Sequence, residues 1–115
     1  MTQSTALTPD LHFLACPSQP LADGRVRRMA YWQWGDPQAQ HVVLCVHGLS
    51  RQGRDFDVLA QALCARAPRP LRVVCPDVAG RGRSDGLADP MAYQLPTYAG
   101  DMQALVAQLQ AQAPL

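Results

Sequence analysis

Two short apolar runs constrain the fold of this chain more than any other feature. They are HVVLCVHG (41–48) and LRVVCPD (71–77), and the segment between them, residues 55–68, has a helical pattern. A strand that is apolar on both faces is typical of a parallel sheet that is covered by helices on both sides. Strand, helix and strand in this order predict a right-handed βαβ unit.

The predicted helix, DFDVLAQALCARAP, begins with acidic residues and ends at a proline, as helices commonly do. The helical spacing predicts that Phe56, Leu59 and Leu63 form its apolar face.

Three further elements flank this unit. LHFLAC (11–16) is a candidate short strand, and RRMAYWQWG (27–35) is rich in the aromatic residues that favour strands. TYAGDMQALVAQLQAQ (97–112) predicts a helix at the end of the chain. Its expected apolar stripe consists of Tyr98, Met102, Leu105 and Leu109.

Composition narrows the class of protein. The chain has 115 residues, of which 48% are hydrophobic, so we expect one folded domain. Its net charge of +1 favours neither nucleic acid nor an acidic membrane as a partner. Residues 1–10 lack the basic and apolar regions of a signal peptide, and the run 42–46 is too short to span a membrane. We therefore expect a cytoplasmic protein.

The four cysteines do not predict a metal site. Cys16, Cys45, Cys64 and Cys75 form no C-x-x-C pair, and no histidine cluster accompanies them. Buried free thiols in a reducing compartment are the simpler interpretation. No cofactor is predicted either, because the glycine-rich stretch GRGRSDG (80–86) lacks the Gly-Lys-Ser/Thr of a phosphate-binding loop.

The same stretch contains the pattern G-x-S-x-G of a hydrolase nucleophile elbow, centred on Ser84. An elbow requires a strand directly before the serine and a helix directly after it. Here residues 76–83 separate Ser84 from the strand, and Pro90 prevents a helix from running on through that point. All three histidines also precede Ser84, whereas the histidine comes last in the triad order of such enzymes. We therefore predict that Ser84 makes local hydrogen bonds and is not a nucleophile.

Three motifs, in their order and spacing, resemble the α/β-hydrolase family. They are an aromatic strand ending in WGDP, an apolar strand ending in HGLS, and VVCPDVAGRGRSD; the similarity covers residues 27–112. The resemblance implies two antiparallel strands, then the third and fourth strands of an eight-stranded, mostly parallel sheet, and a further helix. The expected fold is therefore α/β, the incomplete N-terminal part of an α/β-hydrolase sheet.

The resemblance also implies a division of the chain. Residues 1–26 would be an N-terminal tail that includes the candidate first strand, and residues 27–115 the N-terminal half of the hydrolase domain. The fifth strand and the true nucleophile elbow would follow the last helix, and the chain ends before them.

The resemblance implies a function as well. It implies a cofactor-independent serine hydrolase that cleaves esters, or related acyl or carbon–carbon bonds, in a small-molecule substrate with a Ser-His-Asp triad. The backbone N–H of Leu49 would be one oxyanion-hole donor, supported by His47 and Gly48. His47 itself is expected to make structural hydrogen bonds. No triad member is expected in this chain, which would be inactive alone.

A non-enzymatic function is the alternative. In the family order, the strand that contains residues 42–46 pairs with the fifth strand, so in this chain it would be an open edge. An exposed apolar edge strand can pair with another chain. This alternative is a small α/β module that binds a partner through its sheet edge, by self-association or by complementing a C-terminal half.

Overall fold

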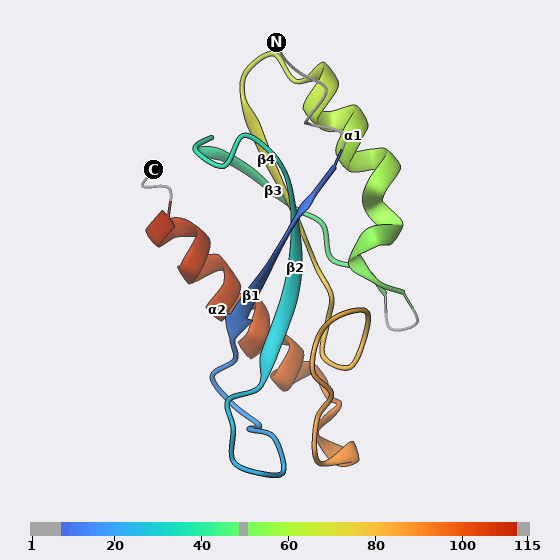
Figure 1. Cartoon of the computed structure of the whole chain (residues 1–115), viewed down its shortest axis with the longest axis vertical. Coiled ribbons are helices and arrows are strands. Elements are labelled where there is room, and N and C mark those ends of the chain that lie inside the picture. Colours follow the sequence, from blue (N-terminus) through green and yellow to red (C-terminus); the bar gives the residue numbers. More distant parts are fainter. Residues whose placement is uncertain (1–7, 49–50, 113–115) are drawn as a thin grey trace.

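The computed structural model describes residues 8–48 and 51–112, and within these ranges it forms one four-stranded sheet with helices on both faces (Figure 1). In chain order the elements are β1 (Asp10–Ala15), β2 (Arg28–Gly35), β3 (His41–Leu44), the 3₁₀ helix η2 (Gly53–Phe56), α1 (Asp57–Arg66), β4 (Leu71–Pro76), the 3₁₀ helix η3 (Pro90–Ala92) and α2 (Leu95–Gln112).

The strand order is β1-β2-β4-β3. β1 pairs antiparallel with β2 and β2 antiparallel with β4, whereas β3 and β4 run parallel. The predicted antiparallel pair and βαβ unit are therefore confirmed. Because β1 pairs with β2 over its whole length, the candidate first strand belongs to the same sheet as the rest.

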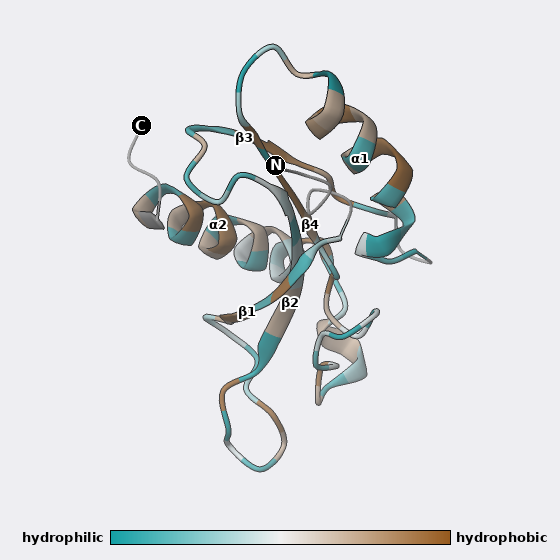
Figure 2. Ribbon diagram, turned by 45° about the horizontal axis from the view of Figure 1, so that its top comes forward, coloured by the Kyte–Doolittle hydropathy of each residue, from teal (hydrophilic) through white to brown (hydrophobic). Residues whose placement is uncertain are grey.

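The position of β4 inside the sheet explains why its sequence is apolar at consecutive positions (Figure 2). Successive residues of a strand point to opposite faces of the sheet. Val73 packs in a cluster with Ala60 of α1, whereas Val74 packs in a cluster with Leu105 and Leu109 of α2. Each helix therefore covers one face, and both faces of β4 are buried.

β3 is shorter and less buried than its apolar run predicts. The strand ends at Leu44, although the Cys45 N–H still donates to the Val74 carbonyl at 2.9 Å. Its three apolar residues are only half-buried, and Val46 beyond it is 49% exposed. The reason is its position, because β3 is an edge strand of the described sheet and only β4 pairs with it.

The predicted apolar face of α1 was partly wrong. Leu59 is 48% exposed, and the fully buried residue of this helix is Ala60. Phe56 and Leu63 do pack against the core, and Cys64 joins them. The helix therefore packs on the sheet through the face that contains Ala60, a small residue that allows close approach.

The face of α2 includes a residue that the apolar stripe did not predict. Leu105 and Leu109 are buried and Met102 packs against them, as expected, but Asp101 is also 1% exposed. Its carboxylate accepts two hydrogen bonds of 2.9 Å from the guanidinium of Arg27, which is fully buried. This ion pair joins α2 to the start of β2.

Neither helix of the described part of the chain is both long and apolar enough to cross a membrane.

Candidate active site

The candidate site lies where β3 and β4 end. Open α/β sheets bind their ligands beyond the carboxyl ends of the parallel strands. Two loops meet there, one running from β3 to α1 and the other from β4 to α2 (Figure 1).

Asp77 joins these two loops. It directly follows β4 and is 1% exposed. One carboxylate oxygen, Oδ1, accepts the Gly53 N–H of the first loop at 2.6 Å. The other, Oδ2, accepts the Arg83 N–H of the second loop at 2.9 Å and the Trp32 indole N–H at 3.2 Å. A buried carboxylate is tolerated when hydrogen bonds of this kind compensate its lost hydration.

Two glycines make room for this carboxylate. Gly82 has a left-handed backbone (φ +52°), and a side chain there would collide with the Asp77 carboxylate. A side chain at Gly53 would lie 2.5 Å from the Cys75 carbonyl oxygen and 2.9 Å from Oδ1 of Asp77. Both loops therefore approach the carboxylate with bare backbone, which only glycine permits here.

His47 forms a second link between the loops. Its Nε2 accepts the Val78 N–H at 3.0 Å, so the ring proton resides on Nδ1, which lies 2.6 Å from the Gly48 carbonyl oxygen and donates to it. The residue is 8% exposed. Both ring nitrogens are thus engaged in hydrogen bonds to the backbone, and His47 holds the end of β3 against the loop that follows β4.

Ser84 lies in the loop after β4, in a turn closed by its own N–H on the Arg81 carbonyl at 3.0 Å. Its hydroxyl donates to the Asp77 carbonyl and accepts the Ala30 N–H of β2 at 2.7 Å. Neither hydrogen bond involves a histidine. The hydroxyl therefore ties the loop to the sheet, and that Ser84 is not a nucleophile stays a prediction.

Leu49, the predicted oxyanion donor, lies outside the described residues, so its role stays a prediction. The residues on either side of the gap are described. The Arg51 N–H donates to the Gly48 carbonyl at 3.1 Å.

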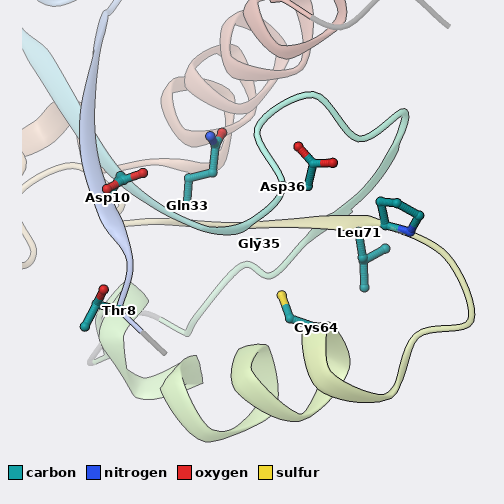
Figure 3. A pocket seen from close by; sticks show the side chains of 8 residues that line it. Thr8, Asp10, Gln33, Gly35, Asp36, Cys64 and Leu71 are labelled. Atoms are coloured by element: carbon teal, nitrogen blue, oxygen red, sulfur yellow. The ribbon is translucent and has the colours of Figure 1, made fainter. Parts of the chain in front are cut away.

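Two hollows lie at opposite ends of the sheet. A cavity of about 270 Å³ lies beside Gly48, and Val46, His47, Gly48, Arg51, Asp55 and Phe56 line it. A larger, more polar one of about 500 Å³ lies at the other end, between the last residue of β2 and the first of β4 (Figure 3). Since the parallel strands begin at that end, only the smaller cavity is at the end of the sheet that open α/β folds use for ligands.

The thiols are free and mostly buried. Burial raises the pKa of both Cys16 and Cys75 from 9.0 to about 12, with a smaller contribution from the neighbouring Asp101 for Cys16 and from Cys45 for Cys75. Such thiols are poor nucleophiles, because the thiolate is the reactive form. No group of three or more histidine, cysteine and acidic side chains in the described ranges is arranged to hold a metal ion.

No protein-family model matches this chain. A curated relative, the 3-hydroxybutyrate-oligomer hydrolase of Cupriavidus necator, is 50% identical over 102 residues, which are 89% of this chain and 32% of the relative. The chain therefore spans about a third of the length of that protein.

Solved structures match a similar share of this chain. The thioesterase domain from the curacin biosynthetic pathway superimposes with a TM-score of 0.74 at 28% identity, over 88% of this chain and 33% of that domain. A putative hydrolase from Rickettsia typhi gives 0.74 at 25% identity, over 88% and 36%. An α/β hydrolase from Novosphingobium aromaticivorans gives 0.64 at 34% identity, over 87% and 31%.

The chain has part of the α/β-hydrolase fold, and it corresponds to the stretch of that fold from the first strand to the helix after the fourth. Asp77 is the site residue that the sequence reasoning left without a role. Its signal was present, since an aspartate directly after a buried strand, followed by two glycines, is a group placed to accept backbone N–H bonds.

Proposed function

We propose that the chain is the N-terminal part of a cofactor-independent serine hydrolase that cleaves the ester bonds of 3-hydroxybutyrate oligomers or close analogues. The observation that carries this proposal is the 50% identity to a 3-hydroxybutyrate-oligomer hydrolase over 89% of the chain. The fold and the position of the smaller cavity support it.

In this proposal the chain contributes half of an oxyanion hole. The nucleophile and its histidine and acidic partners come from sequence that follows the fourth strand and its helix in the family order. Attack on the ester carbonyl places negative charge on its oxygen, and the Leu49 N–H donates to that oxygen. The hydrogen bond between His47 and Val78 and the one between Asp77 and Gly53 hold the chain before and after Leu49 in place before the reaction begins.

A chimera tests the proposal. The 102 matched residues of the Cupriavidus necator enzyme are replaced by the corresponding residues of this chain, and release of 3-hydroxybutyrate from a linear trimer is measured. We expect a folded, active chimera, and no release above background from the 115-residue chain alone. A chimera that is folded by circular dichroism but does not cleave the trimer would contradict the proposal.

The oxyanion role of Leu49 is tested in the same chimera. Leu49→Ala keeps the backbone N–H and should change kcat little, whereas Leu49→Pro removes it and should lower kcat by about 10²–10³-fold. Proline also restricts φ, so the fold of the variant is verified first. Equal rates for the two folded variants would show that this N–H does not stabilise the oxyanion.

Strand addition at β3 is a second candidate function, and the exposed edge favours it. Beside β3 lies a groove of about 360 Å³, to which Val42, Leu44, Val106 and Leu109 contribute the apolar lining. Sedimentation of the chain alone should then show self-association that Val42→Lys suppresses, because a charge on an edge strand opposes pairing. A monodisperse monomer at high concentration would argue against this function.

A further inference from the structure

The exposed Arg51 contributes a positive charge to the lining of the cavity beside Gly48. Among the described residues, no carboxylate lies within ion-pair distance of its guanidinium. The neighbouring Arg54 differs, because it pairs with Asp57 at 2.7 Å and stacks on the ring of Trp32.

The acidic residue of the same cavity is partly engaged by the backbone. The Asp55 carboxylate accepts the Gln52 N–H at 3.1 Å, which closes the start of η2. A ligand in this cavity therefore meets Arg51, which has no ion-pair partner among the described residues, and Asp55, whose carboxylate already accepts a hydrogen bond.

We propose that Arg51 determines substrate specificity by binding the free carboxylate at the acid end of a 3-hydroxy-acid oligomer. The inference rests on the proposed function and names the part of the substrate that this chain recognises. In such an oligomer the terminal carboxylate is separated by a single methylene from the carbon that bears the last ester oxygen. Because Gly48 and Arg51 line the same cavity, a carboxylate held by Arg51 would keep that ester close to Gly48.

The chemistry of the two groups favours this pairing. A guanidinium offers a planar pair of donors that matches a carboxylate, and such charge-assisted bonds are stronger than neutral ones. Val46 and Phe56 provide apolar walls for the methyl and methylene groups of the substrate. The alternative is a solvated arginine, which would not distinguish an acid from its ester.

A binding titration of the 115-residue chain tests the inference without turnover. The ligands are the linear 3-hydroxybutyrate trimer and its methyl ester, followed through the amide signals of Val46, Gly48 and Arg51. We expect Arg51→Gln to weaken binding of the acid at least about tenfold and to leave the ester unchanged. The matched control, Arg66→Gln at the far end of α1, should change neither.

Asp55→Asn should change the affinity for the acid in the opposite direction. It keeps an oxygen for the Gln52 N–H but removes the competing charge, so binding of the acid should tighten about two- to fivefold. Failure of the folded, unmodified chain to bind the acid, or an equal loss of acid and ester in Arg51→Gln, would overturn the inference.

Kinetics in the chimera separate the two proposals. Arg51→Gln should raise KM for the acid at least about tenfold, with kcat and the methyl-ester kinetics unchanged. If the variant cleaves both substrates like the parent chimera, the carboxylate inference is wrong and the proposed hydrolase function stands. If the folded parent chimera cleaves neither substrate, the proposed function is wrong, and the titration still decides whether Arg51 binds the carboxylate.

Discussion

Replacing Asp77 with asparagine tests whether one buried carboxylate holds together the two loops at the candidate site. Asparagine has the same shape but only one acceptor oxygen. If that oxygen keeps the bonds from Arg83 and Trp32, the amide NH₂ group faces the Gly53 N–H, which lies 2.6 Å from the present Oδ1. The variant therefore loses at least one charge-assisted bond and places two buried donors against each other.

The expected cost follows from these contacts. A hydrogen bond to a charged group contributes about 1.5–3 kcal/mol, and a buried donor left without an acceptor carries a penalty of similar size. We expect Asp77→Asn to lower the free energy of unfolding by about 2–3 kcal/mol. For a small domain this shifts the urea midpoint by about 1 M.

Urea unfolding followed by tryptophan fluorescence measures the loss, and the chain provides a local probe as well. It has two tryptophans, so the indole N–H signal of Trp32, which donates to Asp77, can be assigned and should move in the variant. The matched control is Asp89→Asn. Asp89 is exposed and caps η3 by accepting the Met91 N–H, a role that asparagine fills equally well.

An unchanged midpoint and an unchanged Trp32 indole signal in Asp77→Asn would refute the reasoning, since they would mean that the carboxylate does not hold the loops. A similar loss in Asp89→Asn would show that the effect comes from the change of charge and not from the buried bonds.

Three further predictions concern other buried groups. Asp101→Asn leaves Arg27 buried without its counter-charge and should cost about 3–5 kcal/mol by urea unfolding, so a loss below 1 kcal/mol would contradict the role of this ion pair. Ser84→Ala removes the bonds to the backbone and should cost about 1–3 kcal/mol, while a fluorophosphonate probe should leave Ser84 unlabelled, as mass spectrometry can check. Because the pKa of Cys16 and Cys75 rises to about 12 on folding, the thiol forms stabilise the fold below pH 9, and this contribution is lost as the pH rises from 9 toward 12. The thermal midpoint should therefore fall between pH 8 and pH 10.5, and a constant midpoint would contradict it.

The types of element and their order follow from the sequence alone. Apolar runs on consecutive positions predict strands buried on both faces, and the lengths between them leave room for one helix. These are local properties, and they hold for β2, β4 and α2 with boundary shifts of one or two residues. The local hydrogen bonds of Ser84 were also expected from the order of the sequence, because no strand directly precedes this serine.

The tertiary structure determined contacts that the local sequence pattern does not predict. The buried pair of Arg27 and Asp101 joins residues 74 positions apart, and no periodicity links them. Likewise, the rotation of α1 on the sheet buries Ala60 and exposes Leu59, because the small residue permits close packing. The convergence of Gly53, Arg83 and Trp32 on Asp77 exists only once β2, β4 and both loops are assembled, since each donor comes from a different segment of the chain.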